Sequence, residues 1–489
     1  MKIKAQNLAG WCLLLLLPVA SFAATSGEMD LPRAAKSQDK DAVRALLKQH
    51  ADVNTPQGDG STALHWAAHW DDRDMAGLLL GAGANVNAAN DLGVTPLSLA
   101  CINGSAAMVQ ALLKAGANPN LAAVTGVTPL MQCARSGNLE GVEALLARGA
   151  ETNAAENSAG QTALMWAASQ RHPEVVRALV THGANVNART QASGVLVNIN
   201  AGGRGLAAHG PARVVQMGGS TPMLFAARAG CIECARALLA GGASANDTAP
   251  DGNSALVLAA HSGQGAFGVF LLDKDADPNA HGAGYTALHA AALRGELDLV
   301  KALVAHGANL NAPVENGTPL RREGPDYSLA ESMAGGTAFL LAAKYADADI
   351  LRALAAGGAN VKVAAKDGST PLILAVNGEQ RPGTNSGGLA QDESHVADAV
   401  KVMLDLGADV NTANRGGNTA VYLAAARGYP SVVQMLADKG ANVNVKNNRG
   451  LTPLGAAEST RRRGKGGDSG QQARFKVTAD LLRKLGATE

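Results

Sequence analysis

Apolar residues recur along this chain at the spacing of short helices with one buried face. Val109, Leu112 and Leu113 occupy positions i, i+3 and i+4 of one such stripe, a period typical of an amphipathic helix. The same stripe returns at residues 142–146 and 176–180. A shorter, alanine-rich segment precedes each stripe, so the pattern predicts pairs of short helices.

A threonine or serine opens the alanine-rich segment of each unit and marks its period. Thr62, Thr95 and Thr128 are 33 residues apart, and a constant period of this length indicates one supersecondary unit copied along the chain. Such units bury their apolar faces only against their neighbours, which favours a solenoid that works by surface recognition. The eleven anchors are Thr62, Thr95, Thr128, Thr162, Thr221, Ser254, Thr286, Thr337, Thr370, Thr419 and Thr452.

The ends of the units are as regular as their beginnings. Residues 83–87 read Gly-Ala-Asn-Val-Asn, and the same motif returns at 183–187 and 440–444. Glycine favours a left-handed helix C-terminus, and asparagine favours the turn that follows it. Proline follows the threonine at Thr95 and at Thr128, where the first position of a helix needs no N–H donor.

Openings, stripes and exits keep one register from about residue 28 to 489, and in this they resemble the ankyrin repeat. The resemblance implies an all-α solenoid of about 12 helix-turn-helix units, curved, with β-hairpin fingers along one edge. It also implies a non-catalytic scaffold for protein–protein interaction. His65 and His289 occupy the histidine position of the repeat, where the resemblance implies a structural hydrogen bond between neighbouring openings.

The unbroken period argues for one solenoid, although a length of 489 residues would by itself suggest about three domains. Only 3% of the residues are aromatic, so the core must come from many small alanine and leucine contacts. We expect an N-terminal capping repeat over 24–57, because a helix stripe and an exit motif occur there without a threonine opening. The repeat array should span 58–457, and a C-terminal capping helix region with a basic loop should span 458–489.

Insertions interrupt the period near 189–217, 314–335 and 378–395. The first two fall between an exit motif and the next opening, so they should lengthen hairpin fingers. The third falls between the two helices of its unit. Thr318 mimics an opening inside the second insertion, but a helical pattern continues after Thr337 and does not continue after Thr318.

Residues 1–23 have the features of a signal peptide. Lys2 and Lys4 precede an apolar run over 13–17, and small residues end at Ala23, as a signal peptidase requires. The apolar run is shorter than the roughly 20 residues that a bilayer-spanning helix needs. We therefore expect cleavage after Ala23, no stable membrane anchor afterwards, and a mature protein that is periplasmic or secreted.

Charge and glycine patterns do not point to nucleic acid or nucleotide. The 42 basic and 41 acidic residues nearly cancel, which gives no electrostatic case for a nucleic-acid partner. Gly203 and Gly205 follow an apolar run, as in a dinucleotide-binding turn. No acidic residue occurs over 190–229, however, and Pro211 interrupts the helix that should follow. A glycine-rich extended finger is the better interpretation.

Histidine spacing offers a zinc pair that the neighbouring residues do not support. His65 and His69 are four residues apart on a predicted helix, a spacing that can bind zinc. Trp66 stands where a zinc hydrolase would need its glutamate. No serine, cysteine or carboxylate constellation suits catalysis, so we expect no enzyme activity, no metal and no cofactor.

Four cysteines remain once the leader is removed, namely Cys101, Cys133, Cys231 and Cys234. The last two form a Cys-x-x-Cys at the predicted start of a second helix, where a helix N-terminus lowers a thiol pKa. This motif leaves an alternative function, a thiol-dependent redox accessory protein. A structural role, including a disulfide between Cys231 and Cys234, is the competing interpretation, since no thioredoxin-like pattern surrounds them. Cys101 and Cys133 occupy small-residue positions of adjacent first helices, where we expect buried packing.

The resemblance places the recognition surface on the concave side of the stack. There the residue before the opening threonine and the two after the paired small residues should be little used in packing. Arginine and large aromatic side chains concentrate binding energy in interfaces, so we expect an unidentified protein partner to dock here and on the finger between Thr162 and Thr221. The scaffold itself should be monomeric. The candidate residues are His69, Trp70, Arg135, Arg228, His261, Tyr285, Arg294, Lys344 and Tyr345.

Overall fold

The protein folds as a row of helix pairs. A computed structural model describes residues 30–200, 209–316, 333–379, 392–463 and 469–488. These residues form twelve pairs, each an inner helix followed by an outer helix. The inner helices are α1 (Leu31–Lys36), α3 (Ala63–His69), α5 (Pro96–Ile102), α7 (Pro129–Ser136), α9 (Ala163–Ser169), α11 (Pro222–Ala229), α13 (Ala255–His261), α15 (Ala287–Arg294), α17 (Ala338–Lys344), α19 (Pro371–Asn377), α21 (Ala420–Arg427) and α23 (Pro453–Arg463). The outer helices are α2 (Lys40–Lys48), α4 (Arg73–Gly81), α6 (Ala106–Lys114), α8 (Leu139–Ala147), α10 (Pro173–Thr181), α12 (Ile232–Ala240), α14 (Gly265–Leu272), α16 (Leu297–Ala305), α18 (Ala348–Ala356), α20 (Glu393–Asp405), α22 (Pro430–Asp438) and α24 (Ser469–Lys484).

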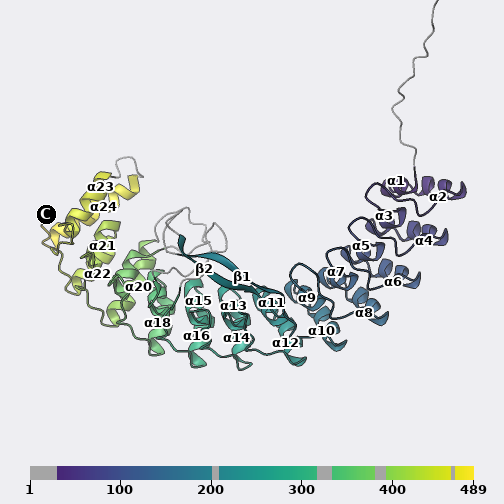
Figure 1. Cartoon of the computed structure of the whole chain (residues 1–489). Helices are drawn as coiled ribbons and strands as arrows, with labels where there is room; N and C mark the ends of the chain where they lie inside the picture. Colours follow the sequence, from purple (N-terminus) through teal and green to yellow (C-terminus); the bar gives the residue numbers. More distant parts are fainter. Residues whose placement is uncertain (1–29, 201–208, 317–332, 380–391, 464–468, 489) are drawn as a thin grey trace, which may run out of the picture.

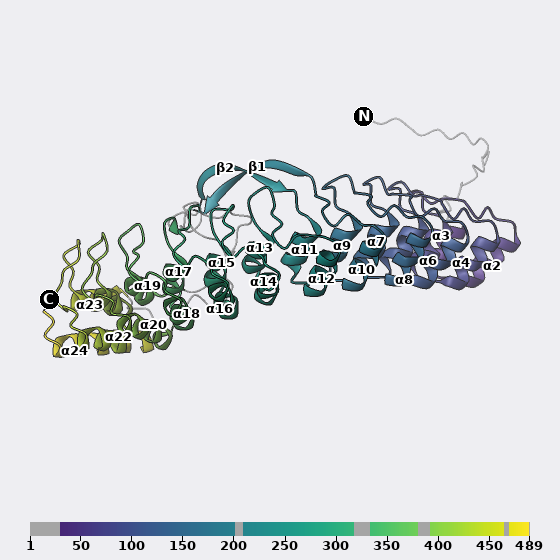
Figure 2. The ribbon, with the colours of Figure 1, turned by 90° about the horizontal axis from the view of Figure 1, so that it is seen from below.

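The helix pairs stack side by side into an arc (Figure 1). Inner helices pack on one another along the concave side, and outer helices pack along the convex side. The connections from each outer helix to the next inner helix project as fingers along one edge (Figure 2). The predicted solenoid of helix-turn-helix units is therefore confirmed.

The inner helices begin at the anchors that the sequence predicts. Thr95 Oγ1 accepts a hydrogen bond from the backbone N–H of Ser98 at 3.2 Å, and Pro96 occupies the first turn of α5. The threonine satisfies a donor that the helix start leaves unpaired, and the proline removes another. Helix α17 likewise begins after Thr337. At the other end of an inner helix, Gly137 terminates α7 with a φ of 75°, a left-handed conformation that glycine adopts without steric cost.

Small side chains set the spacing between neighbouring inner helices. Ala67 and Ala68 of α3 have no exposed surface, and α3 packs on both α1 and α5. Leu64 and Leu79 are also fully buried and fill the space between inner and outer helices. Burying each leucine contributes about 1.5 to 3 kcal/mol, so the stack gains its stability from many similar contributions along its length.

A ladder of asparagine side chains joins the exits of consecutive units. Asn54 Oδ1 accepts the backbone N–H of Asn85 at 2.7 Å, and its Nδ2 donates to the carbonyl of Gly83 at 3.4 Å. Asn87 repeats both bonds one unit later, at 2.7 and 3.3 Å. The asparagines of the exit motif therefore pair backbone groups across the boundary between units, at the exposed surface of the stack.

The first insertion forms a two-stranded antiparallel hairpin, β1 (Ala192–Asn200) and β2 (His209–Gly218). This finger is much longer than its neighbours and reaches past α11 and α13 toward α15 (Figures 1 and 2). The third insertion leads into α20, which has 13 residues against nine in α18. The glycines proposed for a nucleotide turn fall in 201–208, which lies outside the described residues.

Other sequence predictions also fall outside the described residues. These are the leader at 1–23, Thr318 and most of the second and third insertions, and part of the basic loop, at 464–468. Within the described ranges, no helix combines the length and hydropathy that a bilayer span requires.

Candidate protein-binding surface

The β1–β2 hairpin presents two different faces. Val195 pairs with Val215 and Leu196 pairs with Val214, and adjacent pairs of a ladder point to opposite faces. On one face Val195 is 40% exposed and Val215 is half-buried, whereas on the other face Leu196 and Val214 are 68% and 66% exposed. The outer face therefore carries a contiguous pair of exposed aliphatic side chains, a feature that often marks an interaction site.

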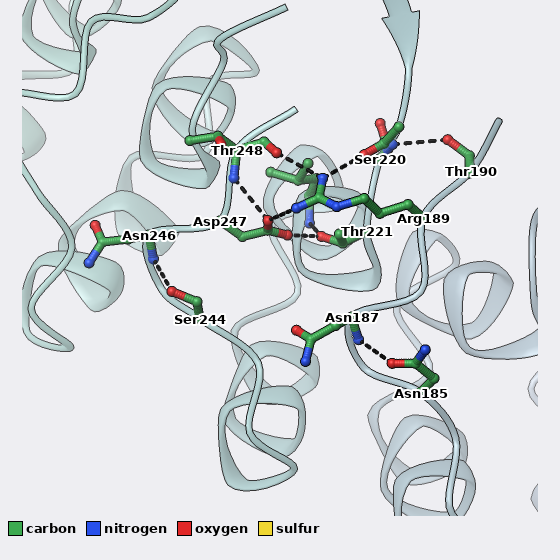
Figure 3. A network of polar contacts seen from close by, with 12 residues as sticks. Asn185, Asn187, Arg189, Thr190, Ser220, Thr221, Ser244, Asn246, Asp247 and Thr248 are labelled. Atoms are coloured by element: carbon green, nitrogen blue, oxygen red, sulfur yellow. Dashed lines mark hydrogen bonds and ion pairs between the residues drawn. The ribbon is translucent and has the colours of Figure 1, made fainter. Parts of the chain in front are cut away.

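Arg189 contacts three partners at the root of the hairpin, where residues 189–191 meet residues 219–221 (Figure 3). Its guanidinium pairs with the carboxylate of Asp247, with 2.7 Å between Nη2 and Oδ1. Its Nη1 donates to the carbonyl oxygens of Gly219 and Thr248, both at 2.9 Å. Since Gly219 follows β2 and Thr248 lies in the finger after α12, Arg189 ties the hairpin to the next finger.

Further bonds close the same root. Thr221, the N-cap of α11, donates its hydroxyl to the carboxylate of Asp247. The Thr190 N–H donates to the Ser220 carbonyl at 3.0 Å, and the Ser220 N–H donates to Thr190 Oγ1 at 2.9 Å (Figure 3). Alanine takes the position of Asp247 in other units, as at Ala88. The fastening therefore belongs to the unit that carries the hairpin.

The hairpin is held at a second point farther along the stack. Arg213 of β2 donates from Nη1 to the side-chain oxygen of Asn316 at 2.8 Å. Asn316 lies in the finger after α16, whereas the root contacts reach the finger after α12. The hairpin therefore runs along the row of fingers as a positioned part of the concave border.

The structure divides the nine predicted concave residues by exposure. His69, Trp70 and Arg135 are exposed. Trp70 also donates its indole N–H to the carbonyl of Lys36 at 3.1 Å, so it covers part of the first helix pair. The half-buried candidates are Arg228, His261, Arg294 and Lys344, and the buried ones are Tyr285 and Tyr345.

The expectation that these positions are little used in packing is wrong for three of them. Tyr285 is only 6% exposed and donates its hydroxyl to Asn253 Oδ1 at 3.0 Å. Tyr345 is also 6% exposed. Arg294 donates its Nε–H to the carbonyl of His261, the last residue of α13, at 2.7 Å. Helix ends leave carbonyls unpaired, and here a side chain from the next unit satisfies one.

Two tryptophans of the inner helices, neither of them among the predicted binding residues, lie half-buried at one repeat position. Trp66 and Trp166 each follow the opening threonine by four residues, and this shared register was the available signal. Lys36 Nζ lies 4.7 Å from the ring centroid of Trp66, and the Arg135 guanidinium lies 5.6 Å from that of Trp166, both within cation–π range. Trp66 donates its N–H to Gln57 Oε1 at 3.1 Å. The Nε1 of Trp166 is buried and has no acceptor among the residues that the structure describes.

His65 and His289 make the bonds that their repeat position implies. Nδ1 of His65 accepts the Thr62 N–H at 3.0 Å, and its Nε2 lies 3.0 Å from the carbonyl oxygen of Val94. Nε2 of His289 lies 2.9 Å from the carbonyl oxygen of Ala312. Burial lowers the pKa of His65 and lowers that of His289 to about 4, because an imidazolium would lose its hydration. Both rings are therefore neutral and structural at neutral pH.

No alternative chemistry gathers around these rings. Over the described ranges, the structure contains no group of three or more histidine, cysteine, aspartate or glutamate residues placed to hold a metal ion. The zinc pair considered for His65 and His69 thus has no third ligand there.

The cysteines lie in two pairs with Sγ atoms at bonding distance. One pair is Cys231 and Cys234 at the start of α12, and the other is Cys101 of α5 and Cys133 of α7. Burial of Cys101 and Cys133 follows the expectation, but their bond across two units was not anticipated. Cys234 has no exposed surface and Cys231 is 6% exposed. The redox alternative therefore lacks support, because thiol exchange needs an accessible thiolate.

Comparisons with known proteins agree with the repeat pattern. A model for ankyrin repeats in three copies matches residues 31–123, 120–190 and 206–282. A model for many copies of the ankyrin repeat matches 403–455, and a model for a single ankyrin repeat matches 283–314. Together these matches cover most of the chain.

Curated relatives are similar over parts of the chain. Ankyrin repeat and SOCS box protein 16 of Homo sapiens is 29% identical over 207 residues, which are 38% of this chain and 43% of that protein. BCL-6 corepressor-like protein 1 of Homo sapiens is 41% identical over 69 residues, 14% of this chain and 4% of that protein. The chain thus spans less than half the length of the curated relatives it matches.

Proposed function

Because the chain belongs to the ankyrin-repeat family, whose repeats form protein–protein interaction scaffolds, we propose that it is an exported, non-catalytic scaffold. Its partner binds across the concave face of the N-terminal units and the β1–β2 hairpin. The observation that carries this proposal is the indole of Trp166, whose buried N–H has no acceptor among the described residues and lies beside the exposed Arg135.

The energetics favour an acceptor from a partner at this point. A buried donor without a partner costs about 1 to 3 kcal/mol. A carbonyl or carboxylate of a bound protein would recover that energy once the Arg135 side chain, which lies over the ring, moves aside to open the way to Nε1. Tryptophan and arginine are the residue types that dominate interface energetics. Trp70 adds an exposed indole on the same side of the stack, 44% exposed at the end of α3.

Export is supported by the sequence of residues 1–23 and by the cysteine pairs. Disulfides form and persist in oxidising compartments such as the periplasm or the extracellular medium. The Sγ atoms of Cys101 and Cys133, in neighbouring units, lie close enough to form a bond, and such a bond would persist only in an oxidising compartment. A periplasmic or secreted location therefore suits both features.

The proposal is tested by recovering partners from the exported fraction of the native host and measuring their affinity. Trp166→Phe keeps the ring and removes the free N–H, so affinity should fall by about tenfold, or 1.4 kcal/mol. Trp66→Phe is the matched control, since its N–H is already used by Gln57. A partner that binds Trp166→Phe and Arg135→Ala as tightly as the wild type would place the site elsewhere.

A further inference from the structure

Strand β1 presents an unprotected edge. Over the described part of the chain, the backbone groups of residues 193–197 bond to no element other than β2. Proteins usually blunt such an edge with proline or a charged side chain, because a row of unpaired N–H and C=O groups is a template for another strand. β1 reads Ala-Ser-Gly-Val-Leu-Val-Asn-Ile-Asn and contains neither device.

Strand β2 has the protection that β1 lacks. Pro211 has no backbone N–H to offer an added strand. Arg213 carries a charge on the same strand and is bonded to Asn316 of a later finger. Of the two hairpin edges, the β1 edge is therefore the one open to pairing.

The hairpin is also incomplete as a folding unit. A two-stranded hairpin is marginally stable in water unless further strands or a helix complete it. This one lies along the border of the molecule, on the finger side of the helix rows (Figure 2). Leu196 and Val214 are exposed on its outer face. A third strand on the β1 edge would satisfy the free backbone groups and extend that apolar face.

We infer that β1 pairs antiparallel with β1 of a second copy of this chain, which builds a four-stranded sheet about a two-fold axis near Val195. A second copy suits the edge because β1 is uncharged, so two identical edges meet without the repulsion that like charges cause across strands. A two-fold axis makes each edge its own complement. The expectation of a monomer is thereby replaced.

Growth stops at two copies. After β1 pairs with β1, the new outer edges are both β2, and each carries Pro211 and Arg213. Pairing along five residues buries much less surface than the about 800 Å² per partner of a standard interface. We therefore expect a closed dimer in reversible exchange with the monomer, and this association requires no other protein.

Sedimentation velocity of the full mature chain over a concentration series tests the inference. The wild type should pass from monomer to dimer. Leu196→Lys places two lysines within about 8 Å of each other across the axis and should raise the dimer dissociation constant at least about tenfold. Val214→Lys is the matched control, because it adds the same charge to the same face with similar exposure, one strand farther from the axis.

Hydrogen exchange identifies the edge that pairs. The amides of residues 193–197 that point away from β2 should become more protected as concentration rises, while those of α12 stay unchanged. A chain that remains monomeric throughout the series would overturn the inference. So would a dimer that Leu196→Lys and Val214→Lys weaken equally, or one that forms without added protection in β1. None of these results depends on the partner proposed for the concave face, which is measured by pull-down.

Discussion

Arg189 and Asp247 are 58 residues apart in the chain, yet their side chains meet at 2.7 Å between two fingers. The Asp247 carboxylate is 12% exposed and also accepts the Thr221 hydroxyl. The pair couples the direction of the longest described finger to the start of α11, so the hairpin projects from the stack at a defined angle.

Replacing Asp247 by alanine, the residue of other units, should loosen the root of the hairpin. We expect the free energy of unfolding to fall by about 1 kcal/mol, since these charged bonds are only partly buried. Amide exchange should quicken at 189–192 and 218–220. Glu174→Ala removes the exposed ion pair with Arg177 on α10 and should change neither quantity. Unchanged exchange at the root would show that Arg189 does not hold it.

Truncating Leu238 tests how stability spreads along the stack. This side chain of α12 has no exposed surface, so Leu238→Ala should cost about 2 to 5 kcal/mol through lost transfer energy and a cavity. Hydrogen exchange should loosen most in α11–α12 and the adjacent pairs, because each unit contacts only its neighbours. Val477→Ala, at a position that is 55% exposed, is the control and should cost little. A uniform loss of protection along the chain would contradict nearest-neighbour coupling.

Acid should weaken the stack partly through His289. The folded pKa of this ring is lowered to about 4, while an unfolded histidine has a pKa of about 6.5. The unfolded state therefore binds a proton first. The contribution of the neutral His289 ring to the free energy of unfolding is fully present above pH 6.5. It is lost as the pH falls toward 4, which lowers the free energy of unfolding by at most about 3 kcal/mol.

Chemical denaturation between pH 7 and pH 4 measures this contribution. His289→Asn should be less stable than the wild type at pH 7 but should lose less stability on acidification. If the free energy of unfolding changed equally with pH in the two proteins, His289 would not bind a proton on unfolding.

Tyr285 should act on stability. Tyr285→Phe removes the hydroxyl that binds Asn253 and should cost about 1 kcal/mol, measured by thermal or denaturant unfolding. Tyr285→Ala should cost about 3 kcal/mol or more, as expected for a buried aromatic ring. Changing Tyr285 and Arg294 together would therefore lower the melting temperature. A loss of binding in that double variant could come from the weakened fold and would not locate the binding site. An unchanged melting curve would show that the hydroxyl bond contributes nothing.

Export should produce a mature chain that begins at Ala24. The motivating features are Lys2 and Lys4 before a short apolar run and the small residues that end at Ala23. Intact-mass measurement on protein from the native host should give the shortened chain in the periplasm or medium. Recovery of a cytosolic chain that retains Met1 would contradict export.

The period of the chain was enough to predict the stack and the helix starts. A repeat unit contacts only its neighbours, so the pattern that opens a helix at Thr95 or Thr337 also carries the information on how that helix packs. The same locality explains why the histidine bonds could be expected at His65 and His289. Their acceptors lie in the connection to the next unit: Val94 directly precedes the opening at Thr95, and Ala312 follows the exit of α16.

Residue identity and period determined by themselves that this protein is a solenoid of helix pairs with a lengthened finger near 189–217. Only the tertiary structure decided which concave side chains are free. Tyr285, directly before its opening threonine, is buried because it reaches Asn253 of the preceding unit, whereas Arg135, seven residues after its opening threonine, stays exposed. The Arg189–Asp247 pair and the Cys101–Cys133 bond are decided in the same way, because each depends on the distance between side chains of neighbouring units.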